Sequence, residues 1–258
     1  MAYLDKKNFF DTLKLRDEHD KDGKITVKIG IIGAMSVEVK ALVEAMEGIV
    51  KDTISQIDFY EGKLDGFEVV IAACGPGKVN AAICTQAMIM RYAPDCVINT
   101  GVAGSLSQVL SVGDYAIATT TVQYDMDTTA IGDPLGFVSG VSRIEFPCDE
   151  KIIHTLSAIA AEQQQKTATG CIATGDVFLT DRVRKNQIVT TFEAIACDME
   201  SASIGHVCYV NAMPYGILRS ISDNANDDSH MDYATFLSLA AENAANVVKL
   251  FVRHMNEL

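Results

Sequence analysis

The chain has 258 residues, 48% of them hydrophobic, and a formal net charge of −13. This length provides enough apolar residues for one large core or two small ones. The acidic excess argues against binding to nucleic acid or to an anionic membrane, because no basic surface offsets it. No apolar run reaches membrane-spanning length, and the N-terminus lacks the apolar core of a secretory signal.

Seven cysteines are scattered through mostly apolar segments, and no pair has CxxC spacing. This usage is typical of reduced core thiols in a cytosolic protein, so we expect a cytoplasmic location. The five histidines form no HxxxH or similar set. We therefore expect no metal site.

The N-terminal region differs from the rest of the chain. Residues 1–26 are predicted to be a mobile leader, since residues 16–24 are nearly all charged or small. The apolar run at residues 27–32 predicts a buried first strand that ends at Gly33. Ser36 then predicts the start of a helix that continues to about Met46.

Strand-like and helix-like patterns alternate through the remaining chain. Residues 54–60 and 67–73 flank a turn-like segment and predict an antiparallel hairpin. The later elements are predicted as a helix (79–91), strands (96–100 and 115–122), a long loop (126–148), a helix (149–165), a strand (168–174), a turn (175–178), a helix (181–190), a strand (194–197) running into a helix, a strand (215–221), a polar loop (222–229) and a closing helix (233–255). No linker divides them, so we predict one α/β domain over residues 27–258, with a mixed, mostly parallel central sheet flanked by helices.

The segment at residues 195–204 places two carboxylates among small and apolar neighbours. Asp198 and Glu200 would lose hydration there and need donors, a proton or a function. Glu200 follows a predicted strand, and ligands bind at the carboxyl ends of strands in open α/β sheets. The structural alternative is that Glu200 faces solvent or caps the next helix.

Three other predicted strands also end in residues suited to chemistry. Because parallel strands place their carboxyl ends on one side, we expect these residues to converge with Met199 and Glu200. They are Met35 and Glu38 after the first strand, the glycine-rich residues 101–104, including Gly104, and Arg219, Ser222 and Asp223. Three carboxylates, one arginine and glycine-lined walls predict a small-molecule pocket.

Each of these residues also has a structural interpretation. Glu38 alone is more typical of an exposed residue on an amphipathic helix, and Asp223 of a turn. Arg219 lies in an apolar strand and would need an anionic partner if buried. Glu200 or Asp223 could be that partner.

Several known motifs are incomplete. Residues 75–78, Gly-Pro-Gly-Lys, resemble part of a phosphate loop, but Val79 replaces the required Ser or Thr. Gly30 and Gly33 lack the full GxGxxG set, and no GxSxG sequence occurs. The sequence thus favours neither a nucleotide-cofactor oxidoreductase nor a serine hydrolase, and we expect no cofactor.

Six segments together resemble the 5′-methylthioadenosine/S-adenosylhomocysteine nucleosidases, a branch of the nucleoside phosphorylase superfamily, in order and spacing. They are KIGIIGAM (28–35) with Glu38, GPGKV (75–79), NTGVAG (99–104), TGDVF (174–178), DME (198–200) and RSISD (219–223). The resemblance covers about residues 27–256, and Glu38 points to the nucleosidase branch. It implies hydrolysis of the N-glycosidic bond of methylthioadenosine and S-adenosylhomocysteine, which releases adenine and the thioribose product for methionine salvage.

The resemblance also implies roles for individual residues. Asp223 would protonate N7 of the departing adenine, Glu38 would activate the water that attacks C1′, and Glu200 would bind the ribose hydroxyls. The further implied roles are Met199 under the ribose, Phe178 stacked on adenine, backbone groups near Leu179 at the adenine edge, Met35 and Tyr233 in the pocket wall, and Arg219 orienting the acidic residues. In this family a homodimer is expected, with a partner subunit closing the thioalkyl end of the pocket through the loop after Tyr124.

The implied roles agree with the chemistry. Breaking an N-glycosidic bond leaves charge on the base and positive charge on the sugar, so an acid, a carboxylate and a positioned water meet its demands. Paired carboxylates serve glycoside hydrolases in a similar way.

Departures from the family pattern bear on substrate preference more than on reaction class. Ser36 and Val37 stand where acidic residues are frequent, and Val102 stands where serine is frequent. The alternatives are a purine nucleoside phosphorylase, a futalosine-type hydrolase and a non-catalytic nucleoside-binding protein. Phosphate binding normally needs arginines or a backbone nest, and Glu38 would repel phosphate. The intact acid, base and ribose carboxylate argue against a non-catalytic protein.

Overall fold

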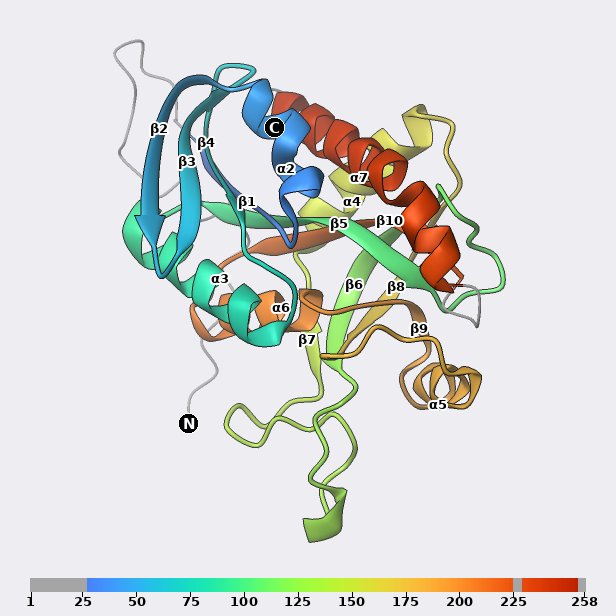
Figure 1. Cartoon of the computed structure of the whole chain (residues 1–258). Coiled ribbons are helices and arrows are strands. Elements are labelled where there is room, and N and C mark those ends of the chain that lie inside the picture. Colours follow the sequence, from blue (N-terminus) through green and yellow to red (C-terminus); the bar gives the residue numbers. More distant parts are fainter. Residues whose placement is uncertain (1–26, 225–228, 255–258) are drawn as a thin grey trace.

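The computed structural model describes residues 27–224 and 229–254 (Figure 1). The predicted leader, residues 1–26, lies outside the described residues. In chain order the elements are β1 (Lys28–Gly33), α2 (Ser36–Glu44), β2 (Glu47–Ile54), β3 (Ile57–Leu64), β4 (Phe67–Ala73), α3 (Lys78–Tyr92), β5 (Cys96–Ser105), β6 (Tyr115–Gln123), η1 (Thr129–Ile131), β7 (Glu145–Pro147), α4 (Glu150–Glu162), β8 (Thr167–Thr174), α5 (Arg182–Phe192), β9 (Ala194–Asp198), α6 (Ser201–Val210), β10 (Tyr215–Asp223) and α7 (Ser229–His254).

The described strands form one mixed sheet in the order β10-β6-β8-β9-β5-β1-β4-β3-β2, with β7 paired to β6. β10 pairs with β6 and also, in parallel, with β5. The strands β5, β10, β6, β8 and β9 therefore close into a ring, and β1, β4, β3 and β2 extend from it. The predicted α/β domain with a mixed central sheet flanked by helices is confirmed.

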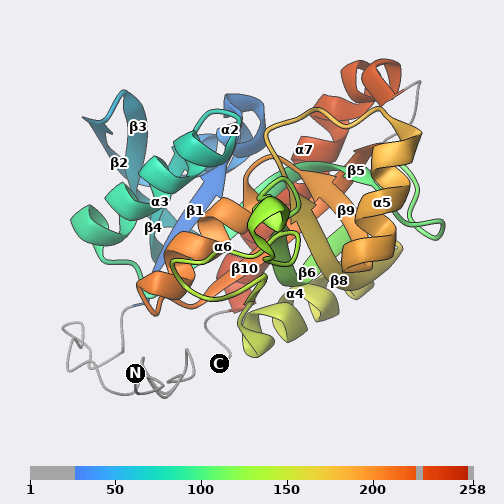
Figure 2. The same cartoon turned by 90° about the horizontal axis from the view of Figure 1, so that it is seen from below.

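Helices cover both faces of the sheet (Figures 1 and 2). One apolar core joins the sheet to α2, α4 and α7, and a second joins it to α3 and α6. β1 shows why one strand serves both cores: Ile29 and Ile31 belong to the first and Ile32 to the second, as the two-residue period of a strand requires. Within the described ranges, no helix is long and apolar enough to cross a membrane.

The predicted hairpin is part of a three-stranded antiparallel unit, β2-β3-β4. Its turn lies at Asp65 and Gly66, whose φ angles are 50° and 90°, and residues 61–64 belong to β3. β2 was not predicted, because its residues are mostly exposed and show no apolar alternation. Five of the ten strand pairings are antiparallel, more than the single hairpin that we expected.

Two predicted strands are longer than expected. β5 continues through the glycine-rich residues 101–104 because it pairs with β10 as far as Gly104. β10 continues to Asp223, so the predicted loop at residues 222–229 begins too early. β9 runs antiparallel to β5, with Cys197 opposite Gly104. We expected the strand before Glu200 to run parallel to the strands that carry the other site residues, and this expectation was wrong for β9 and β5.

Candidate active site

A pocket lies where β1, β5, β9 and β10 end, and its empty volume of about 590 Å³ includes its open mouth. This size is typical of a small-molecule site. Nine of the ten residues proposed from the sequence line it: Met35, Glu38, Gly104, Phe178, Leu179, Met199, Glu200, Asp223 and Tyr233. Arg219 lies behind the wall, fully buried.

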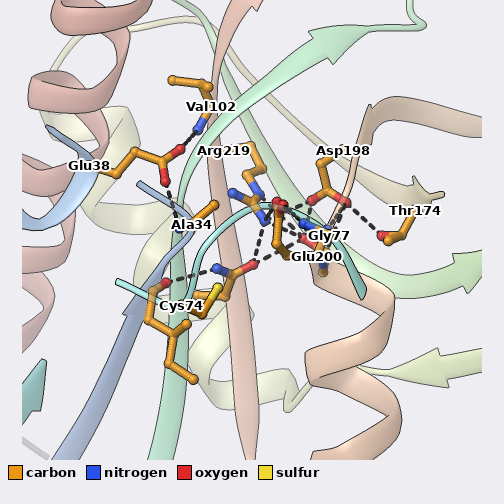
Figure 3. A network of polar contacts seen from close by, with 12 residues as sticks. Ala34, Glu38, Cys74, Gly77, Val102, Thr174, Asp198, Glu200 and Arg219 are labelled. Carbon is orange, nitrogen blue, oxygen red and sulfur yellow. Dashed lines mark hydrogen bonds and ion pairs between the residues drawn. The ribbon is translucent and has the colours of Figure 1, made fainter. Parts of the chain in front are cut away.

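Glu38 points into the pocket from the first turn of α2 and is 1% exposed. Its Oε2 atom accepts hydrogen bonds from the backbone N–H of Ala34 at 2.6 Å and Met35 at 2.8 Å. Its Oε1 atom accepts one from the N–H of Val102 at 3.0 Å (Figure 3). Burial raises the pKa of Glu38 from its ordinary value, while Arg219 and these donors oppose the rise. The carboxyl group is thus fixed, dry and suited to hold a proton.

Glu200 follows β9 and is 4% exposed. Its Oε1 atom accepts a hydrogen bond from the N–H of Gly77 at 2.9 Å, and its Oε2 atom lies 3.6 Å from Nη2 of Arg219. Burial raises the pKa of Glu200 to about 7, against the lowering effect of Arg219. A carboxyl group with this pKa changes charge near neutral pH.

Arg219 holds the polar centre together from β10 (Figure 3). Its Nη2 atom lies 2.9 Å from Oδ2 of Asp198 and donates to Oδ1 of Asn99 at 2.6 Å. It also donates to the hydroxyl of Ser201 at 3.0 Å. The closer anionic partner is therefore Asp198, which the sequence did not suggest, and Glu200, which it did suggest, is a second partner at 3.6 Å. A buried arginine needs such a partner, because an unpaired buried charge is costly.

Asp198 is the most heavily bonded carboxylate of this network. Its Oδ1 atom accepts from the hydroxyl of Thr174 at 2.6 Å and from the N–H groups of Glu200 at 3.3 Å and Ser201 at 3.2 Å. The hydroxyl of Ser201 donates to its Oδ2 atom. These bonds fix the turn between β9 and α6, and so the start of the Glu200 side chain.

One donor of Arg219 remains unused. Its Nη1 atom is buried and has no hydrogen-bond partner among the described residues. A Cβ atom on Gly101 would lie 2.5 Å from this Nη1 and 2.4 Å from Oε1 of Glu38. The two atoms are therefore less than about 5 Å apart, a gap that one water molecule can bridge, and buried polar groups normally find such a partner.

Asp223 ends β10 and is 3% exposed. The hydroxyl of Ser222 donates to its Oδ2 atom at 3.0 Å. Asp223 and Glu38 line the same pocket from different elements. The two carboxyl groups can therefore reach one bound molecule.

Aromatic side chains form one wall of the pocket. Phe178, which is 44% exposed, meets Tyr233 edge-to-face with ring centroids 5.3 Å apart. The hydroxyl of Tyr233 donates to the sulfur of Met35 at 3.2 Å. A partly exposed aromatic ring beside a pocket offers a stacking surface for a planar base.

Several contributors were not assigned a role from the sequence. Gly77 belongs to the Gly-Pro-Gly-Lys segment, which was compared with a phosphate loop, yet its N–H binds Glu200 rather than an anionic ligand. Asp198 was recognised only as a costly buried carboxylate. The polar residues around Asp198 and Arg219 form no sequence motif that predicts this network, because Asn99, Thr174 and Ser201 come from two separate strands and a helix. In the described ranges, no group of three or more His, Cys, Asp or Glu residues could hold a metal ion.

Residues 28–253 match the model of the phosphorylase superfamily. A 5′-methylthioadenosine/S-adenosylhomocysteine nucleosidase from Shewanella piezotolerans is 39% identical over 230 residues, which cover 89% of this chain and 100% of the relative. This chain belongs to the methylthioadenosine/S-adenosylhomocysteine nucleosidase family.

Solved structures agree with this family. The nucleosidase from Neisseria meningitidis, in complex with methylthio-immucillin-A, is 36% identical with a TM-score of 0.84, and the match covers 87% of this chain and 98% of that one. The futalosine hydrolase of Helicobacter pylori is 34% identical with a TM-score of 0.85, and the match covers 90% and 99%. The fold is thus shared by proteins that are named for different substrates.

Proposed function

We propose that this protein hydrolyses the N-glycosidic bond of 5′-methylthioadenosine and S-adenosylhomocysteine, and releases adenine and the thioribose product. The observation that carries the proposal is the presence of Glu38, Glu200 and Asp223, three carboxyl groups from distant segments, in one largely buried pocket. The names of its relatives support this substrate class.

The attacking water would sit between Glu38 and Arg219. Oε1 of Glu38 is an acceptor, and Nη1 of Arg219 is a buried donor without a partner in the part of the chain that the structure describes. A water held by both would have one lone pair free to attack C1′ while Glu38 takes its proton. The raised pKa of Glu38 suits this role of general base.

Glu200 would act on the sugar. Its carboxylate is anchored by the Gly77 N–H and lies beside Arg219, so its charge is held in a fixed position. An oxocarbenium-like sugar carries positive charge in the transition state, and a prepositioned anion stabilises that charge without reorganising. Met199, the preceding residue, would pack under the ribose ring.

Asp223 would act on the base. It is buried at the end of β10, in the same pocket as Glu38, and accepts from Ser222. Proton donation from Asp223 to N7 would neutralise the departing adenine, with Phe178 stacked on the ring and backbone groups near Leu179 at its edge. Gly104 would let the base approach the β5 backbone closely.

Two features favour water over phosphate as the nucleophile. Neither lysine nor arginine occurs among the described residues that line the pocket. Glu38 stands where an incoming anion would have to lie, and it would repel a phosphate group. A phosphorylase activity is therefore the weaker candidate.

A futalosine-type hydrolase is the second candidate, because the Helicobacter pylori futalosine hydrolase matches this chain closely. Val102 packs in an apolar cluster with Met35, Val37 and Tyr233. An apolar wall favours a small thioalkyl group over a large polar 5′ substituent, so we expect methylthioadenosine to be cleaved faster than S-adenosylhomocysteine or futalosine.

We also propose that the active form is a cytoplasmic homodimer. The segment around η1 projects from the body of the molecule (Figure 1) and carries Ile131, which is 81% exposed. A second subunit would cover this side chain and use the segment to close the thioalkyl end of the pocket. The seven cysteines are free and buried, which suits a reducing compartment.

The test is turnover in phosphate-free buffer. Methylthioadenosine, S-adenosylhomocysteine, futalosine, inosine and adenosine would be compared by release of free base and reducing sugar. We expect the first two to be cleaved fastest. An absolute requirement for phosphate would end the hydrolase proposal, and a preference for futalosine would favour the second candidate.

The Asp223→Asn variant tests the assignment of the acid. It should fold normally, bind adenine nucleosides and lose most of its turnover, about 100-fold or more. Unchanged turnover would remove Asp223 from the mechanism.

A further inference from the structure

Three residues beside the pocket form a closed triangle of contacts. Oδ1 of Asp125, two residues after β6, lies 2.6 Å from Nζ of Lys78. Oδ2 of Asp125 accepts from the N–H of Asp176 at 2.9 Å. Oδ1 of Asp176 accepts from the N–H of Lys78 at 2.8 Å. The side chains of Lys78 and Asp125 are only 19% and 17% exposed, so their ion pair is largely shielded from solvent.

The triangle joins two walls of the pocket. Lys78 follows Gly77, whose N–H binds Glu200 at 2.9 Å. Asp176 precedes Phe178 by two residues, and Val177 and Phe178 both line the pocket. Asp125 thus touches the segment that anchors the sugar carboxylate and the turn that carries the proposed stacking ring. Residue 78 begins α3, whereas residues 125 and 176 lie in the separate segments after β6 and β8, so the sequence alone does not suggest this link.

We propose that Asp125 is a positioning residue for the hydrolytic reaction. Through Lys78 and Asp176 it holds the Gly77 N–H against Glu200 and the Phe178 turn against the base. The identity of the reaction rests on the proposed function, whereas the link from Asp125 to Glu200 rests on the contacts alone.

The geometry explains why one carboxylate can hold both walls. The N–H groups of Gly77 and Lys78 stand at the start of α3, where helix N–H groups have no intrahelical acceptor. Glu200 accepts from the first and Asp176 from the second, so both carboxylates help to fix the helix start. Asp125 accepts a hydrogen bond from the backbone N–H of Asp176 and forms an ion pair with the Lys78 side chain, so it restrains both residues. The Lys78 carbonyl also accepts from the hydroxyl of Ser203 at 2.6 Å, which ties the same point to α6.

A purely structural ion pair would have different consequences. Its loss would lower the free energy of unfolding but leave the folded enzyme unchanged in kcat, KM and pH behaviour. Lys28 and Glu61, 2.7 Å apart with side chains 28% and 37% exposed, form such a pair between β1 and β3. Glu61→Gln is therefore the matched control.

The first experiment compares Asp125→Ala, Asp125→Asn and Glu61→Gln with the wild type on methylthioadenosine. Misplacement of catalytic groups by about 1 Å costs on the order of 100-fold in rate. We expect Asp125→Ala to lose kcat by about that factor and to raise KM as the Phe178 turn loosens. Asp125→Asn, which keeps one acceptor oxygen, should recover part of the loss. Glu61→Gln should match the wild type.

The second experiment needs no turnover. The pKa of Glu200 would be followed by NMR of ¹³C-labelled glutamate side chains in the free protein, with Glu200→Gln to assign the signal. Loss of the Gly77 hydrogen bond should raise this pKa, by about one pH unit. Removal of the negative charge of Asp125, which leaves the Lys78 ammonium unpaired, would by itself lower the pKa of Glu200. A rise in this pKa therefore indicates loss of the Gly77 hydrogen bond, and a fall indicates only the change in nearby charge.

The outcomes separate the two proposals. If Asp125→Ala leaves the pKa of Glu200 unchanged or lowers it, the positioning role is wrong, whatever the enzyme cleaves. Unchanged kcat and KM in a less stable Asp125→Ala protein would also overturn it. If the wild type cleaves no nucleoside but the pKa rises in the variant, the proposed function fails and the link from Asp125 to Glu200 stands.

Discussion

Oε1 of Glu38 and Nη1 of Arg219 face each other across Gly101. A Cβ atom on residue 101 would lie 2.4 Å from the first and 2.5 Å from the second, which is closer than real Cβ contacts allow. Glycine at this position therefore keeps open the space between the proposed base and a buried donor that no described residue pairs with. The lack of a side chain at residue 101 is therefore as necessary for the proposed water site as the charged groups of Glu38 and Arg219.

Gly101→Ala is expected to abolish most activity. The added methyl group would displace the Glu38 carboxyl group, the guanidinium or the water between them, and we expect kcat to fall about 100-fold. Overpacking should also lower the free energy of unfolding by about 1–3 kcal/mol. Steady-state kinetics and urea unfolding would measure the two effects. Gly140→Ala is the control, since no atom of residues 27–224 or 229–254 lies within 4 Å of its Cβ position. Equal activity in both variants would contradict the proposed water site.

The three proposed catalytic carboxylates could be anticipated because each stands after or at the end of a strand. Glu38, Glu200 and Asp223 stand next to buried apolar runs, and burial of those runs carries the carboxylates to the pocket. The way in which Glu200 arrives could not be read from local patterns. β9 is antiparallel to β5, and its position depends on ring closure through β10, a pairing between distant strands.

The residues that hold the proposed catalytic groups in place were harder to predict from the sequence than those groups themselves. The glycine-rich stretch 101–104 resembles a loop, yet pairing with β10 keeps it extended. The role of Gly77 depends on a backbone N–H, which every residue except proline possesses, so no residue type reveals it. Asp198 was visible as a buried carboxylate, but its pairing with Arg219 is decided by the packing of β9 against β8 and α6.

Glu200 should make stability depend on pH in a direction opposite to most carboxylates. Burial raises its pKa from 4.5 to about 7, so the unfolded chain releases this proton at lower pH than the folded protein does. Its contribution to stability is complete below about pH 4.5 and is lost as the pH rises towards 7. Urea unfolding of the wild type and Glu200→Gln across pH 4.5–8 would measure it. We expect the wild type to lose stability relative to the variant over this window, and a constant difference would show that Glu200 is not desolvated.

Asp198→Asn should be strongly destabilising. An amide cannot neutralise the fully buried Arg219 at 2.9 Å, and its NH₂ group would face the hydroxyl donors of Thr174 or Ser201. Breaking a buried ion pair in this way costs about 3–5 kcal/mol. The control is Asp65→Asn, which breaks the Arg253–Asp65 pair on the surface and should cost about 1 kcal/mol or less. Thermal or urea unfolding would compare them, and similar losses in the two variants would mean that Asp198 is not the main counterion of Arg219.

Ile131→Asp should weaken the proposed dimer and the thioalkyl site together. An exposed isoleucine on a projecting segment gains little in a monomer, whereas burial against a second subunit would stabilise the pair by about 1.5–3 kcal/mol. A charge at this position should therefore lower the association constant at least tenfold and raise KM for methylthioadenosine more than for adenosine. Val50→Asp is the control, because Val50 is 64% exposed on β2, away from this segment (Figure 1). Sedimentation at several protein concentrations would give the mass. A wild type that remains monomeric at micromolar concentration, or an Ile131→Asp variant with unchanged mass and KM, would rule out this segment as the partner's contribution.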